Sequence, residues 1–175
     1  MRTARGLCDR PDNPYPKAGR NRIVAEDELT AALSQALAIC QDRGGRLTPQ
    51  RRAVLGALLT ADRPLTAYDL LDVLRPTDPA LTPASTYRSL DFLVGMGLAH
   101  RLETTHSFLA CRHPDHPHAS QFLICRRCGS VVEAEDQTLA EATAGLGERH
   151  GFKVDRRTVE LTGLCAPCDG DAQPG

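Results

Sequence analysis

Two Cys-x-x-Cys pairs carry the strongest chemical signal in the sequence. Cys125 and Cys128 form the first pair, and Cys165 and Cys168 form the second. Each pair can fold into a tight turn whose sulfurs face one point, so the two pairs can supply the four thiolates of a tetrahedral zinc site. The alternatives are a redox dithiol, which needs one pair rather than two, and buried free cysteines. Because four protein ligands leave no open coordination position, the pairs predict a structural zinc site.

A second and looser group of possible ligands surrounds the His- and Pro-rich segment 112–120. A segment of this kind is only a compositional indication of metal binding. For each histidine, a solvated loop residue is the alternative, and the spacing alone does not decide between the two. The group consists of His100, Cys111, His113, His116, His118 and Glu133.

Composition excludes several classes of protein. The chain has 175 residues, 41% of them hydrophobic and 25% charged, which is the balance of a soluble globular protein. It has no apolar run near the ~20 residues of a membrane span. The N-terminal arginines precede no apolar stretch, which argues against a secretory signal. Four of the seven cysteines fall into the two Cys-x-x-Cys pairs, and the chain has no export signal. We therefore expect reduced thiols that bind metal, and a cytoplasmic protein.

Charge alone does not indicate a nucleic-acid partner. The net charge is −1, from 21 basic and 22 acidic residues. Residues 1–104 hold 14 basic and 12 acidic residues, a balance of +2, and the remainder holds 7 and 10, a balance of −3. This mild asymmetry permits DNA contact in the first half without requiring it.

Apolar residues at helical spacing predict four helices in the first half. The first spans about 26–43 and ends at Gly44-Gly45, and the fourth ends around Gly95 and Gly97. Three threonines open the other helices, because a threonine oxygen can accept from the free N–H groups of a first turn. Proline follows two of them, and proline suits the first helical position. The capping residues are Thr48, Thr66 and Thr82.

The period then changes, and segments 98–102 and 107–111 read as two strands joined by a polar turn. Packed helices followed by a hairpin are the plan of a winged helix-turn-helix domain. Further along, strands are expected at 121–125, 130–133 and 152–162, with a helix at 138–150. A unit this small usually needs a metal or a partner subunit to be stable.

The predicted fold class is therefore α+β, with an N-terminal winged helix-turn-helix domain and a small C-terminal α/β dimerisation domain. We divide the chain into a disordered arm, a winged-helix DNA-binding domain, a hinge linker, a zinc-binding dimerisation domain and a tail. Their bounds are residues 1–25, 26–111, 112–119, 120–168 and 169–175.

Several runs together resemble the ferric uptake regulator family, and within it the zinc uptake regulator branch. The resemblance covers about Glu26 to Cys168, nearly all of the chain expected to be ordered. The runs are specific in combination, although each alone is modest. They are RLTPQR (46–51), TAYDLLD (66–72), STYRSLDFL (85–93), FLICRRCG (122–129) and GLCAPC (163–168).

The resemblance implies a second, sensory zinc at the hinge, and so two zinc ions per subunit. The ligand positions that match the branch are His100 on the wing, Cys111 at the end of the hairpin, His118 and Glu133. Two nitrogens, one thiolate and one carboxylate favour zinc over iron or manganese. The loop also reads His-Pro-Asp-His-Pro-His, which departs from the His-His-Asp-His run of iron- and peroxide-sensing relatives. An iron or manganese sensor of the same family is the alternative.

Some histidines and cysteines belong to neither of the two predicted zinc sites. His106, His113 and His116 are interpreted as surface histidines, although some relatives carry a further zinc site in this region. Cys40 lies on the apolar stripe of the first helix and is expected in the core. Cys8 lies in the arm and is expected to be free.

The fourth helix is the expected DNA-reading element. Tyr87, Leu90 and Val94 are interpreted as its inward stripe, so Ser85 and Arg88 point elsewhere. An arginine near the start of such a helix can reach guanine N7 and O6 in the major groove, and a solvated arginine is the alternative. The resemblance favours base contacts by Arg88 and Tyr68. The candidate phosphate partners, which position without reading sequence, are Thr86, Tyr87, Arg51 and Arg52. Ser85 is also expected on the DNA-binding surface.

The sequence as a whole predicts a homodimeric repressor that binds double-stranded operator DNA and represses zinc-uptake genes when zinc is bound. The rival from another class is a zinc hydrolase that uses the His/Cys/Glu group. A hydrolase keeps one coordination position for water and places a base beside it, whereas this group supplies four protein ligands. We therefore expect no enzymatic activity and no small-molecule substrate.

Overall fold

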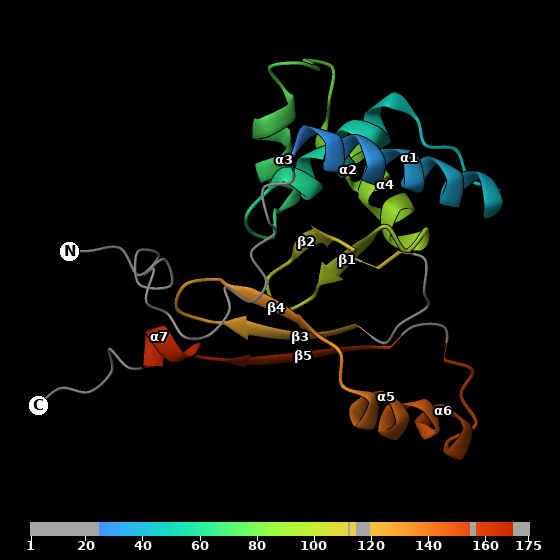
Figure 1. The fold of residues 1–175 in the computed structure, drawn as a ribbon, viewed down its shortest axis with the longest axis vertical. Coiled ribbons are helices and arrows are strands. Elements are labelled where there is room, and N and C mark those ends of the chain that lie inside the picture. The colour runs from blue at the N-terminus through green and yellow to red at the C-terminus, as the bar shows by residue number, and fades with distance from the viewer. Residues whose placement is uncertain (1–24, 112, 115–119, 155–156, 170–175) are drawn as a thin grey trace, which may run out of the picture. The chain divides into compact units, whose positions relative to one another are not determined.

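The structure is a computed structural model that describes residues 25–111, 113–114, 120–154 and 157–169. The chain divides into two compact units, one ending at Pro117 and the other running from His118 onwards. Figure 1 labels the helices and strands of the two units. The expectations for the arm before Ala25, and for Cys8, His116 and His118, lie outside the described residues.

The described part of the first unit contains four helices, and the starts of three of them confirm the predicted threonine caps. The side chain of Thr48 accepts from the N–H of Arg51, and that of Thr66 accepts from the N–H of Asp69. Thr82 accepts from the N–H of Ser85. Each bond satisfies a donor that a first turn otherwise leaves without an acceptor. The helices are α1 (Glu26–Asp42), α2 (Pro49–Thr60), α3 (Ala67–Leu74) and α4 (Pro83–Gly95).

A two-stranded antiparallel hairpin completes this unit. Strand β1 (Ala99–Leu102) pairs with β2 (Ser107–Ala110). Leu65, just before α3, bridges to Phe108 and so joins the hairpin to the helices. Helices followed by this hairpin confirm the predicted winged-helix plan. One apolar core runs through the helices and the hairpin, and its fully buried members include Val54, Leu58, Leu70, Leu90 and Leu93.

The second unit is a three-stranded sheet with short helices. Its strand order is β4-β3-β5, with β3 (Ser120–Cys125) in the middle (Figure 1). Strand β4 (Val131–Ala134) is antiparallel to β3, and β5 (Thr158–Gly163) is parallel to it. Parallel pairing requires a crossover, and helices α5 (Gln137–Ala144) and α6 (Leu146–Arg149) lie within it.

Two expectations for this crossover are wrong. The single helix expected over 138–150 is interrupted at Gly145, which lies between α5 and α6. The strand expected from residue 152 begins only at Thr158. A Cβ on Gly147 would lie 2.8 Å from the carbonyl oxygen of Phe152 and 2.4 Å from Val154. This position therefore admits only glycine, because the chain turns back tightly over α6.

None of the helices among the described residues is long and apolar enough to cross a membrane.

Candidate metal centre

The four cysteines of the two Cys-x-x-Cys pairs converge at one edge of the sheet. Cys125 is the last residue of β3, and it lies opposite Gly163, the last residue of β5. Because the carboxyl ends of parallel strands meet at the same edge, the turns that follow the two strands become neighbours. One ligand atom from each of Cys125, Cys128, Cys165 and Cys168 lies within 4.8 Å of the others. The structure thus brings together all four residues that the spacing paired.

Local backbone bonds shape the first turn. The N–H of Cys125 donates to the carbonyl oxygen of Ser130 at 2.9 Å, and the N–H of Gly129 donates to that of Cys125 at 2.9 Å. Gly129 has a φ of 73°, a left-handed conformation that favours glycine. The glycine after Cys128 therefore closes the turn and leaves both sulfurs on its inner side.

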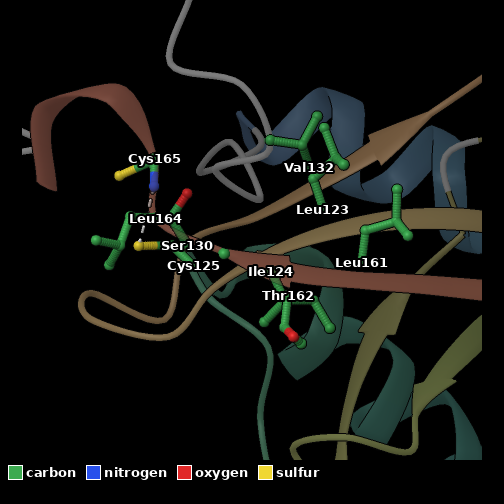
Figure 2. Close-up of a pocket in the computed structure, with 10 residues that line it drawn as sticks. Leu123, Ile124, Cys125, Ser130, Val132, Leu161, Thr162, Leu164 and Cys165 are labelled. Carbon is green, nitrogen blue, oxygen red and sulfur yellow. Dashed lines mark hydrogen bonds between the residues drawn. The ribbon is translucent and has the colours of Figure 1, made fainter. Parts of the chain in front are cut away.

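The second turn is a short helix, α7 (Ala166–Asp169), that begins directly after Cys165. The N–H groups of Cys168 and Asp169 donate to the carbonyl oxygen of Cys165 at 2.8 and 2.9 Å. The N–H of Cys165 lies 3.4 Å from Sγ of Cys125, so the second turn also contacts the first (Figure 2). Sγ of Cys128 lies 3.7 Å from Sγ of Cys165.

The surroundings of Cys125 favour its thiolate. Burial of the thiol raises its pKa, but this effect is outweighed by the backbone N–H groups of Cys128, Cys165 and Arg127 and by the Cys128 thiol. The net result lowers the pKa of Cys125 to about 6. Thiolate is the form that binds metal. Four close sulfurs, one of them pre-set for ionisation, fit a divalent ion that prefers tetrahedral thiolate ligation, which is zinc.

The first unit carries two of the residues matched to the sensory site. His100 lies opposite Leu109 in the hairpin, and Cys111 follows Leu109 by two positions. Alternate residues of a strand share a face, so His100 and Cys111 lie diagonally on one side of the hairpin. A ring nitrogen of His100 and Sγ of Cys111 lie within 4.8 Å of one another. Cys111 is 6% exposed, which suits a thiolate sheltered from solvent.

The other two matched residues belong to the second unit. Glu133 lies on β4, opposite Phe122 of β3, and is half-buried. His118 lies outside the described residues. Of the histidines expected at the surface, His106 and His113 are exposed, and Cys40 is fully buried in the core as expected.

Helix α4 presents part of the expected DNA-reading surface. Arg88 is exposed and Tyr87 is 44% exposed, and Tyr68 at the start of α3 is 65% exposed. Ser85 is half-buried, and its hydroxyl donates to the carbonyl oxygen of Thr82 at 3.0 Å. The inward stripe differs from the expected one, because Tyr87 points outward. The buried residues of α4 are Thr86, Ser89, Leu90 and Leu93.

Two of the candidate phosphate partners, Thr86 and Arg51, make hydrogen bonds within the first unit. Thr86 is 0% exposed, and its hydroxyl donates to the carbonyl oxygen of Thr82 at 3.0 Å. Its side chain is therefore part of the core, with its hydroxyl already bonded within the helix. The guanidinium of Arg51 donates to the carbonyl oxygen of Arg46 at 2.6 Å and covers the ring of Phe92. Arg52, one residue on, is exposed and remains the stronger candidate of the pair.

The sequence did not indicate that two further arginines, Arg43 and Arg127, hold loops near the candidate metal ligands. Arg43, just after α1, donates to the carbonyl oxygens of Met96 and Pro114, at 2.5 and 3.1 Å. Arg127, inside the first Cys-x-x-Cys turn, donates to the carbonyl oxygen of Cys168. Neither contact has a signal in the sequence, because each joins residues far apart along the chain.

Known proteins place the chain in a family. The model of the ferric uptake regulator family matches residues 42–162. The chain is 42% identical over 137 residues to the zinc uptake regulation protein of Escherichia coli, a match that covers 78% of this chain and 80% of that protein. It is 27% identical over 145 residues to the peroxide-responsive repressor PerR of Staphylococcus aureus, covering 83% and 97%.

Solved structures of zinc regulators share the fold. A zinc uptake regulator complexed with zinc and DNA is 40% identical, with a TM-score of 0.75, over 82% of this chain and 96% of that one. The holo form of the regulator XcZur is 40% identical, with a TM-score of 0.70, over 80% and 98%. The winged-helix unit, the four-cysteine cluster and these matches lead to one conclusion: the chain belongs to the ferric uptake regulator family.

Proposed function

We propose that this protein is a zinc-responsive DNA-binding transcription regulator that represses zinc-uptake genes when zinc is bound. One observation carries the proposal. A winged-helix unit and a four-cysteine cluster occur in one chain whose fold matches a regulator solved with zinc and DNA at a TM-score of 0.75. Such a regulator acts where chromosomal DNA and reduced thiols are found, which is the cytoplasm.

Two zinc ions per subunit are proposed, with different roles. The four-cysteine site has no open position, so its zinc is structural and contributes to the folding of the second unit. The regulatory zinc takes His100, Cys111, His118 and Glu133 as ligands. The closeness of His100 and Cys111 on one face of the hairpin supports this assignment. A ligand set that mixes a thiolate with imidazoles favours zinc over iron and manganese.

A homodimer is proposed from the surface of the second unit. Leu123 on β3 is 44% exposed and Leu161 on β5 is 54% exposed. With Val132 of β4 they line an apolar hollow of about 280 Å³ beside the cysteine cluster (Figure 2). Exposed apolar side chains that adjoin on one face of a sheet form a surface that a partner can cover. A second copy would bury this surface and provide two reading heads, as a two-fold symmetric operator requires.

Regulation then follows from linkage. Zinc held by ligands from both units couples their orientation to metal binding, and the orientation in turn sets how two heads meet successive major-groove faces. The metal can favour the DNA-binding arrangement only by as much as its affinity differs between the two arrangements. By reciprocity, DNA must tighten zinc binding by the same factor.

The test is a DNA selection at controlled metal. The full-length protein is stripped of labile metal and used to select binding sites from random DNA at buffered free zinc, iron(II) or manganese(II). The proposal expects recovery of one two-fold symmetric sequence with zinc at the lowest free concentration. Selection by iron or manganese at lower free metal would replace it with the iron or manganese sensor, and no enrichment with any metal would refute DNA-based regulation.

A further inference from the structure

Arg127 contacts both turns of the four-cysteine cluster. Its backbone N–H donates to the sulfur of Cys125 in the first turn. Its guanidinium reaches across to the second turn, where Nη1 donates to the carbonyl oxygen of Cys168. These two ligands are separated by 40 and more residues in the chain, yet a single side chain and its own peptide group bridge them.

The carbonyl that Arg127 contacts is one that needs a donor. Cys168 lies in the last turn of α7, where carbonyl groups have no partner within the helix. The Cys168 side chain is 0% exposed, so the carbonyl that follows it sits next to a buried ligand. Holding this carbonyl therefore holds the fourth sulfur in place.

The negative charge of a zinc-loaded site is a second reason why the Arg127 guanidinium should stabilise it. Four thiolates around one Zn²⁺ leave an excess of negative charge, and a nearby guanidinium offsets part of it. Groups that orient the ligands of a metal site typically change its metal affinity by about 10- to 100-fold when they are removed.

Arg126 provides a matched comparison within the same turn. Its backbone N–H donates to the carbonyl oxygen of Gly163 at 2.9 Å. Its side chain is exposed and forms no hydrogen bond or ion pair with the part of the chain that the structure describes. Loss of the Arg126 guanidinium thus removes the same charge from the same turn without removing a link to the second turn.

We infer that Arg127 is a positioning residue that locks the second Cys-x-x-Cys turn onto the first and thereby slows loss of zinc from the four-cysteine site. The inference rests on the proposed zinc occupancy of this site. It assigns to Arg127 a function that Arg126 does not have, although the two residues are adjacent and carry the same charge.

The experiment measures zinc release from the full-length protein to an excess of a chromogenic chelator. It uses a Cys111→Ala background, so that the regulatory site does not contribute to the signal. R127Q should release zinc about 10-fold faster than the background protein, whereas R126Q should stay within about twofold of it. R127K keeps the charge and one donor, so it should recover part of the loss.

Cobalt substitution provides a readout that a general loss of stability does not mimic. Cobalt-loaded R127Q should retain the sulfur-to-metal charge-transfer band of a four-thiolate site and should exchange cobalt for zinc faster. Equal acceleration in R126Q and R127Q would overturn the inference in favour of charge alone, and so would release from R127Q at the background rate. If R127Q did not load metal, R127K would be compared with R126K: faster release from R127K alone supports positioning by the Arg127 guanidinium, and equal rates in the two variants refute it. Background protein with no zinc at all would instead refute the proposed zinc site.

Discussion

The guanidinium carbon of Arg51 lies 3.5 Å from the centroid of the Phe92 ring. This contact joins α2 to α4 inside the winged-helix unit, and the hydrogen bond from Arg51 to Arg46 fixes the same side chain to the preceding loop. A cation over an aromatic face contributes about 0.5–2 kcal/mol, depending on its exposure. Arg51, the last residue of the RLTPQR run, therefore stabilises the winged-helix unit in this structure.

Arg51→Ala should consequently destabilise the winged-helix unit by about 1–2 kcal/mol. Arg52→Ala should leave the free energy of unfolding within about 0.5 kcal/mol of the wild type. If Arg52 contacts a phosphate, its loss should weaken binding to all DNA sequences alike and reduce the salt slope by about one unit. Chemical denaturation and a salt titration of DNA binding separate the two variants, and the reverse pattern would exchange their roles.

Arg88→Ala should reduce discrimination between DNA sequences but should not affect metal binding. Arg88 is exposed on α4, so its loss leaves no cavity and should preserve both zinc ions. A bidentate contact to guanine contributes about 1–3 kcal/mol of discrimination. Competition between the selected operator and random DNA at fixed salt should show this loss per half-site. An equal weakening of binding to both DNAs would assign Arg88 to the phosphate backbone.

Cys111→Ala tests the regulatory site. The variant should remain a folded protein that retains its structural zinc, because Cys111 belongs to the other unit. It should bind operator weakly at free zinc levels that activate the wild type, since coupling of about 1–3 kcal/mol is typical of such switches. His113→Ala, which removes an exposed histidine nearby, is the matched control. A Cys111→Ala binding curve that overlays the wild type across several decades of free zinc would remove Cys111 from the switch.

Cys168→Ser tests the structural site. Structural zinc in small peptides contributes apparent binding free energies of about 10–16 kcal/mol at pH 7, and this unit has little apolar core besides Phe122, Ile124 and Val131. We expect protein that lacks one zinc equivalent and unfolds or aggregates at lower temperature. Cys40→Ala removes a buried thiol from the other unit and should keep full zinc content by elemental analysis. A stable Cys168→Ser protein with wild-type zinc would contradict the structural assignment.

The start of α3 should make stability depend on acid pH. Arg63 holds the pKa of Asp69 well below its usual range, through a 2.7 Å contact, and the carboxylate also accepts from the N–H and the hydroxyl of Thr66. A folded-state pKa below that of the unfolded chain adds stability at neutral pH, and this stability is lost as the pH falls below about 4. Asp69→Asn should therefore cost about 1 kcal/mol at pH 7, a modest value because Arg63 is half exposed.

The measurement for this prediction is urea denaturation of both proteins at several pH values. The difference between the wild type and Asp69→Asn should be constant from pH 6 to 8 and should shrink at pH values below about 4. A difference that grows on acidification would mean that the charged carboxylate does not contribute to the cap.

Features set by neighbouring residues could be predicted, and those set by distant contacts could not. Thr48, Thr66 and Thr82 cap their helices as expected because a cap depends on residues three positions away. The paired cysteines were likewise evident, since each turn is local. The face of α4 was predicted one position out of phase, because apolar residues alone mark it and the structure buries Thr86 and Ser89 there as well.

Errors were larger in the crossover of the second unit. The helical pattern over 138–150 did not predict the tight turn around Gly147. This turn results from the close approach of Phe152 and Val154. The bridge from Arg127 to Cys168 depends on which residue of β5 lies opposite which residue of β3. No pattern of residues around Arg127 in the sequence specifies its contact with Cys168.

Because the cysteines follow β3 and β5, zinc binding depends on the register in which these two strands pair. No side chain of β5 is buried, and a strand without a buried face has little to prevent it from slipping along its neighbour. A slip of one residue would move Cys165 and Cys168 by about 3.3 Å along the sheet and turn β5 over. The four sulfurs could then no longer meet. Zinc would thus be retained by correctly paired chains, and the zinc content of a preparation would measure the fraction of molecules that have folded in the right alignment.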